Sequence, residues 1–226
     1  MSSLLASADD VLRRAAWTTR SAEVRSSLVR LAACLMAFAL WYGAVMGAFR
    51  GLTGQDQWLR QMIYSAMKVP LLLTASFALG LPSFFVLSTL FGLRRDFAES
   101  VRALVAAQAG LAIVLAALSP LTLLWYASSV DYQQALLFNG AMFATASVAA
   151  QYLLRAYYRP LLQRDPRHRR MLACWALIYI LVAIQLAWLL RPFIGSPNAD
   201  VQFLRPEAWD NAYVKVGQLI WRAVGR

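Results

Sequence analysis

Hydrophobic residues dominate five long windows of the chain in which Asp, Glu, Lys, Arg and His do not occur. These windows are 19 to 28 residues long, and together they hold 115 of the 226 residues. A helix needs roughly 20 apolar residues to cross about 30 Å of hydrocarbon, and a helix satisfies its own backbone hydrogen bonds in a bilayer. The pattern therefore predicts an all-α polytopic membrane protein that folds as a five-span helical bundle.

The limits of the windows divide the chain into three parts. Residues 31–190 form the predicted transmembrane domain, between an amino-terminal segment 1–30 and a tail 191–226. Asp131 alone separates the third and fourth windows, so we expect a tight turn within 127–133. The spans are then expected at about 31–49, 69–93, 103–126, 134–154 and 171–190.

Both flanking segments also have helical patterns. The sequence Ser7-Ala8-Asp9-Asp10 is typical of a helix N-cap followed by acidic residues, which predicts an amphipathic helix before the first span. The run 191–197 contains two prolines and a glycine and is expected to form a turn. Helical spacing returns in 206–224, and this amphipathic segment fits either a helix in the membrane interface or a helix packed on the bundle.

The distribution of basic residues predicts the orientation. Fourteen of the 22 lie before the first span, in 94–102 and in 155–170, whereas 8 lie on the opposite side. Because basic residues accumulate on the cytoplasmic side, the amino terminus is expected in the cytoplasm and the carboxyl terminus outside. The chain has 20 arginines against 2 lysines, which favours a GC-rich bacterial genome and hence the bacterial inner membrane.

Composition supports the membrane class, since 60% of the residues are hydrophobic and 15% are charged. This balance argues against a soluble globular enzyme and against a disulfide scaffold. The net charge of +11 lies in short segments beside the windows. It therefore favours contact with membrane lipids, through anionic headgroups at the cytoplasmic face, over binding of nucleic acid.

Residues for metal or catalytic chemistry are scarce. His168 is the single histidine and lies in a basic loop, where it is expected to be solvated. Cys34 and Cys174 fall in predicted helices and are interpreted as small apolar residues. The windows contain no carboxylate, and neither a GxSxG nor a Walker A pattern occurs. We therefore predict no catalytic residue, no metal site and no cofactor.

The most unusual features gather in the predicted outer half. Lys68 lies at the mouth of the second span, Arg191 follows the fifth, and Asp131 lies in the turn between the third and fourth. One hypothesis is an outer pocket in which Lys68 and Arg191 bind an anionic headgroup or a partner's carboxylate, with Asp131 as counter-charge. The alternative is that both cations only extend toward water. Helix kinks are expected at four prolines: Pro70, Pro82, Pro120 and Pro192.

Spans three and four carry small residues at four-residue spacing, which allows helices to approach closely. The pairs are Ala106/Gly110, Ala112/Ala116, Gly140/Ala144 and Ala146/Ala150. They predict that the two spans pack as a hairpin or against another subunit. Asn139, Gln151 and Gln185 are expected to form hydrogen bonds between helices.

Two segments carry a resemblance to known sequences. They are Lys68-Val69-Pro70-Leu71-Leu72 leading to Leu81-Pro82-Ser83, and the run 188–197 followed by Phe203, Arg205, Asn211 and Tyr213. From the second span to the tail, the chain resembles an uncharacterised family of small bacterial multi-pass membrane proteins, and it has a more distant similarity to Yip-type five-span membrane proteins. The resemblance implies about five spans and a short outer tail, but the family has no established activity that could be carried over to this chain.

These features predict a membrane scaffold or accessory subunit without enzymatic activity. Its expected partner is another membrane protein, a second copy of the chain, or lipid. One alternative is a small transporter or permease component that uses the kinked second span. Another is a lipid-modifying enzyme, although the clustered acids and histidines that such enzymes use are missing from the sequence.

Overall fold

The computed structural model describes residues 2–19, 24–195 and 200–204, and within these ranges the chain is helical with no β-strand. The predicted tail helix 206–224 lies outside the described residues. In chain order the helices are α1 (Ser2–Arg13), α2 (Ala16–Thr19), α3 (Val24–Gly47), α4 (Phe49–Leu52), α5 (Trp58–Leu90), the 3-10 turn η1 (Arg94–Asp96), α6 (Phe97–Ala117), α7 (Ser119–Ser128), α8 (Tyr132–Arg164) and α9 (Arg167–Leu190).

Five helical stretches of the described chain are long and apolar enough to cross a membrane, which confirms the predicted number. They cover 25–52, 58–90, 94–128, 132–164 and 167–190. The turn expected within 127–133 is also found, because α7 ends at Ser128 and α8 begins at Tyr132. The second stretch begins before its charge-free window, since Arg60, Gln61 and Lys68 belong to the same helix.

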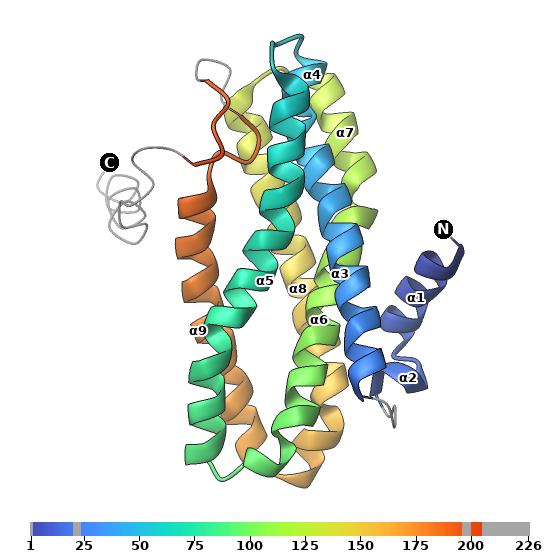
Figure 1. Cartoon of the computed structure of the whole chain (residues 1–226), viewed down its shortest axis with the longest axis vertical. Helices are drawn as coiled ribbons and strands as arrows, with labels where there is room; N and C mark the ends of the chain where they lie inside the picture. Colours follow the sequence, from blue (N-terminus) through green and yellow to red (C-terminus); the bar gives the residue numbers. More distant parts are fainter. Residues whose placement is uncertain (1, 20–23, 196–199, 205–226) are drawn as a thin grey trace.

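The long helices lie side by side in one bundle (Figure 1). α3 packs on both α5 and α6, α6 packs on α8, and α5 packs on α9. Helix α5 runs from beside α3 at one end of the bundle to beside α9 at the other. In the stretch 94–128, 61% of the most apolar part is buried, against 6% in α9. The α6 helix is therefore central, whereas few residues of α9 are fully buried.

Two glycines of α3 allow this helix to approach α5 closely. A Cβ atom added at Gly43 would lie 2.8 Å from the Cα of Ala66, and one added at Gly47 would lie 2.6 Å from the Cα of Met62. Both neighbours belong to the backbone of α5, so the side chain of any other residue would force the helices apart. The four-residue spacing of small residues thus brings α3 against α5, a pair that the sequence-based interpretation did not include.

Spans three and four pack on each other, as their small residues predict. Gly110 of α6 faces the side chain of Leu153 of α8 so closely that an added Cβ would overlap it. Ala106, Ala112 and Ala146 are buried in the same core. Gly140, by contrast, has open space where a Cβ would lie, so this glycine is not part of a close contact.

Of the four prolines at which kinks are expected, Pro120 coincides with an interruption of a span. Pro120 lies in the first turn of α7, and the third span is divided there into α6 and α7, which meet at Leu118. Pro70 and Pro82 lie inside α5, which continues as one helix from Trp58 to Leu90. Pro192 follows Arg191, the C-cap residue of α9, and so lies beyond the end of this helix. A further proline inside a helix, Pro160 in α8, was not among the predicted kinks.

The amino-terminal helix begins earlier than the sequence pattern predicts. We expected a cap at Ser7, but α1 starts at Ser2, and the Ser7 hydroxyl donates to the Ser3 carbonyl oxygen within the helix at 2.8 Å. Leu4 packs against the buried core together with Ala8 and Val11, so the apolar face of α1 begins before Ser7. The Asp10 carboxylate accepts a hydrogen bond from the Trp17 indole at 2.9 Å, which ties α1 to α2.

A buried hydrogen-bond network joins three helices around Asn139 of α8, as predicted for this residue. Its Nδ2 donates to the Tyr126 hydroxyl of α7 at 2.6 Å and to the Ala135 carbonyl oxygen at 2.8 Å. The Tyr42 hydroxyl of α3 donates to Asn139 Oδ1 at 3.3 Å. The Tyr126 hydroxyl in turn donates to the Met46 carbonyl oxygen at 3.2 Å.

Replacing Asn139 with leucine should therefore destabilise the bundle. Two tyrosine hydroxyls would lose a buried partner, and hydrogen bonds of this kind between membrane helices contribute about 0.6 kcal/mol each and up to about 1.7 kcal/mol. Thermal unfolding of the purified protein in detergent measures the effect. In a double-mutant cycle with Tyr126→Phe, we expect the two losses to be less than additive, because both remove the same bond. Full additivity would contradict the network.

Candidate functional site

Lys68, the predicted outer cation, is fully buried in the structure. Its Nζ donates to the Pro192 carbonyl oxygen at 2.7 Å and lies 5.2 Å from the ring centroid of Phe203. Both contacts come from the segment after α9, which returns across α5. A buried ammonium requires such an acceptor, because removing the charge from water is costly. Lys68 therefore holds this return segment, residues 191–195 and 200–204, on α5.

Two further polar residues of α5, one turn and two turns before Lys68, also bond to the return segment. Gln61 Nε2 donates to the Phe193 carbonyl oxygen at 2.9 Å and to Ser65 Oγ at 3.0 Å. The Ser65 hydroxyl donates to the same Phe193 oxygen. Gln61, Ser65 and Lys68 are all buried and form one polar face of α5. This face supplies three donors to two consecutive carbonyl groups of the return segment.

Apolar contacts also hold the return segment against α5. Ile194 and Val201 are buried, and the Phe203 ring packs edge-on against Tyr64 with centroids 5.4 Å apart. Gly195 has a φ of +81°, and a Cβ there would lie 2.7 Å from Cδ of Gln61. Glycine is needed at this position for both its backbone angle and its close contact.

Arg191, the second predicted cation, lies at the start of the return segment. It is the C-cap residue of α9, and its guanidinium carbon lies 3.3 Å from the ring centroid of Trp188. The structure thus brings Lys68 and Arg191 to the same segment. The sequence-based hypothesis gave these cations an external anion, whereas the described contacts of Lys68 are with the chain itself. Binding of an anion by Lys68 and Arg191 stays a prediction.

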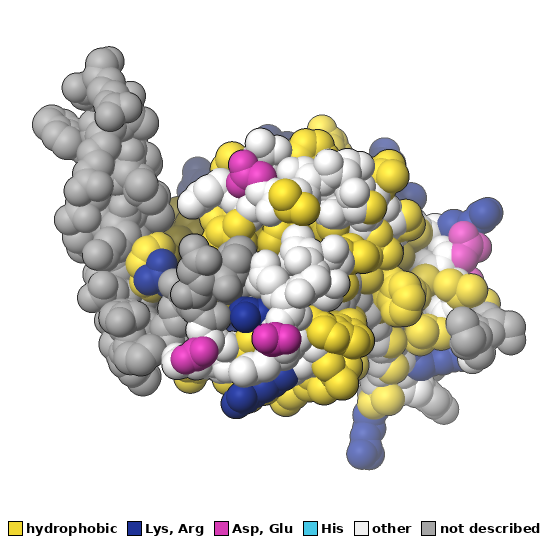
Figure 2. Space-filling view, turned by 90° about the horizontal axis from the view of Figure 1, so that it is seen from above, with side chains coloured by type: hydrophobic (Ala, Val, Ile, Leu, Met, Phe, Trp, Pro, Cys, Tyr) yellow, Lys and Arg dark blue, Asp and Glu magenta, His cyan; other side chains and the backbone are white. Residues whose placement is uncertain are grey.

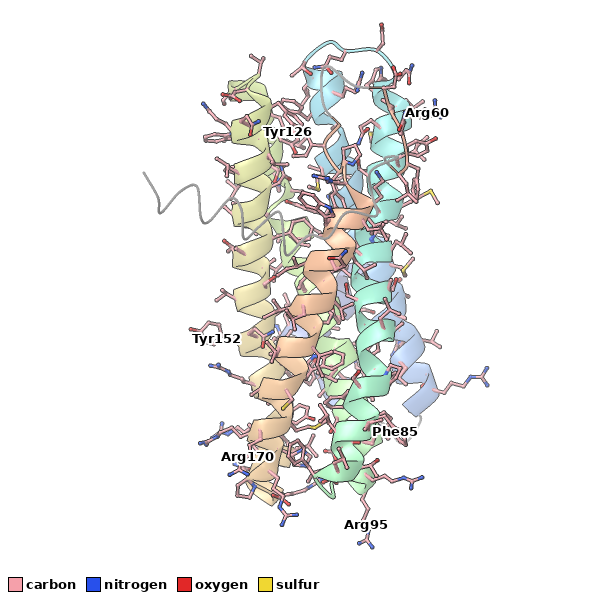
Figure 3. The ribbon with its side chains drawn as sticks, turned by 90° about the vertical axis from the view of Figure 1, so that its left-hand side faces the viewer. Arg60, Phe85, Arg95, Tyr126, Tyr152 and Arg170 are labelled. Carbon is pink, nitrogen blue, oxygen red and sulfur yellow. The ribbon has the colours of Figure 1, made fainter. Side chains whose placement is uncertain are left out.

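Asp131, the predicted counter-charge, caps α8. Its Oδ1 accepts hydrogen bonds from the backbone N–H groups of Gln133 at 2.8 Å and Gln134 at 3.2 Å. In Figure 3 the beginning of α8 and the beginning of α5 stand on opposite sides of the bundle. Asp131 therefore has a local role at a helix start, away from the polar face of α5 that holds Lys68.

The other members of the Lys68 cluster were missed in the sequence. Gln61, Ser65 and Lys68 follow one another at spacings of four and three, which places them on one face of a helix. That spacing is a signal that could have been found, although all three residues lie before the charge-free window 69–93. The acceptors are backbone carbonyls, which have no signature in a sequence.

The two ends of the bundle differ in charge. We call the end where α5, η1, α6, α8 and α9 meet the arginine end, because exposed arginines gather there: Arg94, Arg95, Arg155, Arg159, Arg164, Arg167, Arg169 and Arg170. In Figure 3, Arg95 and Arg170 lie at this end and Arg60 lies at the other. Seen from the opposite end, which holds α4, acidic and basic side chains are interspersed with apolar ones (Figure 2).

His168 is buried at the arginine end, so the prediction that it is solvated is wrong. It is 1% exposed, and its Nε2 lies 3.1 Å from Oδ2 of Asp96 in η1. The Tyr158 ring packs edge-on against it, with centroids 5.6 Å apart. Although its sequence neighbours are arginines, His168 is on the inner side of the first turn of α9. It joins the start of α9 to η1 and α8.

In comparisons with known proteins, no family model, curated protein or solved structure matches the chain. The resemblance to small bacterial multi-pass proteins stays a prediction.

Proposed function

We propose that the chain is a non-enzymatic accessory subunit or scaffold of a membrane, with the arginine end in the cytoplasm, that binds a membrane-protein partner or lipid through its outer surface. Five apolar helices are compatible with an integral membrane protein. The observation that carries the proposal is the internal pairing of polar groups within the spans. Lys68 bonds to Pro192, Asn139 to Tyr126, and the Tyr179 hydroxyl donates to Oε1 of Gln108 at 3.1 Å. Such pairing stabilises a packed interior.

The surface between α8 and α9 supports binding of a partner helix. These two helices contact each other only slightly and leave between them a cavity of about 480 Å³. Gln151 of α8 lines this cavity and is exposed, although it lies within a charge-free window. An amide at that depth gains a hydrogen bond when another helix covers it. Around it, α8 and α9 expose large apolar side chains such as Val148, Leu177 and Ile180.

Affinity purification of the tagged full chain from its own host in mild detergent, followed by native mass spectrometry, tests the proposal. We expect a second membrane protein at fixed stoichiometry. Replacing Gln151 with leucine should reduce its retention, and Gly140→Ala on the same helix serves as the matched control. Recovery of the chain with a small molecule that is not a lipid, and with no protein partner, would contradict the accessory role.

A small transporter that uses α5 is the second candidate. Its supporting observation is the buried Ser76 hydroxyl, which has no hydrogen-bond partner within the described part of the chain. We expect Ser76→Cys, in a background without Cys34 and Cys174, to resist a membrane-impermeant maleimide added to either side. Labelling of this cysteine in intact vesicles would reveal water inside the bundle and favour the transporter.

A further inference from the structure

A cavity of about 530 Å³ lies at the arginine end, between the amino-terminal helices and the bundle. Four arginines line it: Arg13 at the end of α1, Arg14 in the turn that follows, Arg102 from α6 and Arg164 from α8. Its wall includes Tyr157, whose hydroxyl donates to the Val11 carbonyl oxygen at 2.8 Å and lies 3.1 Å from Thr18 Oγ1. The buried Tyr157 thereby fixes α1 and α2 against α8.

Arg14 is held in this cavity by a backbone carbonyl of α8 that lacks its usual hydrogen bond within the helix. Pro160 has no N–H, so the carbonyl oxygen of Ala156 receives no hydrogen bond from that position of the helix. The Arg14 guanidinium donates to this Ala156 oxygen at 3.2 Å. Arg14 also adopts a φ of +58°, a backbone conformation uncommon outside glycine, at the turn between α1 and α2. The fold thus fixes the position of a positive group at the cavity wall.

The cavity keeps an excess of positive charge. Glu99 is the acidic residue in its lining, and it pairs with Arg164 at 2.6 Å. Arg13 pairs with Asp9 at 2.7 Å, and Asp96 lies 3.7 Å from Arg164. The Ala156 carbonyl that accepts from Arg14 carries no net charge. Guanidinium groups bind phosphate through paired N–H donors, so the cavity suits a phosphate group.

A second, apolar cavity of about 320 Å³ shares two lining residues with the first, Arg14 and Ala156. It continues between α1, α6 and α8 along small or aliphatic side chains: Leu12, Gly110, Val114 and Ala149. Gly110 and Ala149 belong to charge-free windows, whereas Arg155 marks the end of the fourth window. The two cavities therefore lie on either side of the predicted boundary between hydrocarbon and headgroups.

We propose that this pair of cavities is a binding site for one anionic phospholipid, with its phosphate among Arg13, Arg14, Arg102 and Arg164 and an acyl chain in the apolar groove. A free phosphate ion would fill only the arginine-lined cavity. A phospholipid would fill both cavities, because its phosphate suits the arginines and its acyl chain suits the apolar groove. The inference rests on the membrane location in the proposed function and names the lipid that the arginine end recognises.

Native mass spectrometry of the full chain, released from micelles with equal amounts of phosphatidylglycerol and phosphatidylcholine, tests the site. We expect preferential retention of phosphatidylglycerol. Arg102→Gln and Arg14→Gln should each lower the ratio of the two bound lipids about fivefold, as expected for one basic residue near an anionic headgroup. The matched control is the double variant Arg95→Gln/Arg170→Gln, which removes exposed charge at the same end and outside the cavity.

A variant that fills the groove keeps the test independent of the arginines. Ala149→Leu retains all four guanidinium groups, and we expect it to lower retention of phosphatidylglycerol while Gly140→Ala does not. An equal loss in Arg95→Gln/Arg170→Gln would overturn the site in favour of general surface attraction. Displacement of the lipid by inorganic phosphate, with no effect of Ala149→Leu, would assign the cavity to free phosphate. The ratio of bound phosphatidylglycerol to phosphatidylcholine does not depend on whether a protein partner is captured. The accessory role and the lipid site can therefore be contradicted independently.

Discussion

Replacing Gly43 with alanine is expected to lower the free energy of unfolding by about 1–3 kcal/mol, the usual cost of excess volume in a packed core. The added methyl would meet the backbone of α5 at Ala66, and a backbone cannot move aside as the end of a side chain can. Helices α3 and α5 would have to separate along their contact. Thermal unfolding in detergent, followed by circular dichroism, should show a fall of several degrees in the apparent Tm.

Gly140→Ala provides the matched control for this prediction. Gly140 also lies within a long helix, but open space surrounds the position of its missing Cβ. Alanine is the better helix former by about 0.5–1 kcal/mol, so this variant should be neutral or more stable than the original chain. If both variants lower the Tm alike, the close approach of α3 and α5 is not what makes Gly43 necessary.

Replacing Lys68 with methionine should release the return segment from α5. Methionine preserves the length of the side chain but leaves the buried Pro192 carbonyl without its charged donor, at a cost of about 1–3 kcal/mol. The reporter is a cysteine at the buried position 194, introduced as Ile194→Cys in a background without Cys34 and Cys174. We expect its rate of labelling by a hydrophilic maleimide to rise about tenfold, which corresponds to ~1.4 kcal/mol.

Arg95→Gln is the control for charge removal, since Arg95 is exposed at the opposite end of the bundle. It should leave the labelling rate at position 194 unchanged. An unchanged rate in Lys68→Met as well would mean that Gln61 and Ser65 hold the Phe193 carbonyl without help from the lysine. The triple replacement Gln61→Leu/Ser65→Ala/Lys68→Met would then be required to open the segment.

The features that could be predicted from the sequence are those with a strong periodic or compositional signal. Long charge-free windows are apolar around the whole helix, so the number of spans and the turn at Asp131 follow from the sequence. Asn139 could be identified because a polar amide inside an apolar helix needs a partner. The packing of spans three and four follows from their small residues.

What could not be predicted depends on which helices meet. Gly43 and Gly47 have the same spacing as the pairs in spans three and four, yet spacing alone does not identify the facing helix. The residues directly before and after His168 are arginines, and its partner Asp96 lies 72 positions earlier. Lys68 bonds to a backbone carbonyl 124 positions later, and every residue has such a group. These contacts are consequences of the tertiary arrangement.

The contact between Arg14 and the carbonyl that Pro160 leaves without a helical partner also bears on the order in which the parts of the bundle come together. The carbonyl that holds Arg14 lies 142 positions later in the chain, and Tyr157, which fixes Val11, lies 146 positions later. Helices α1 and α2 also pack on α3 and α6, which are synthesised earlier than α8. The part of their docking surface that α8 supplies, the Ala156 carbonyl and the Tyr157 hydroxyl, exists only after the fourth predicted span has been synthesised. Complete docking of the amino-terminal segment therefore depends on a late part of the chain.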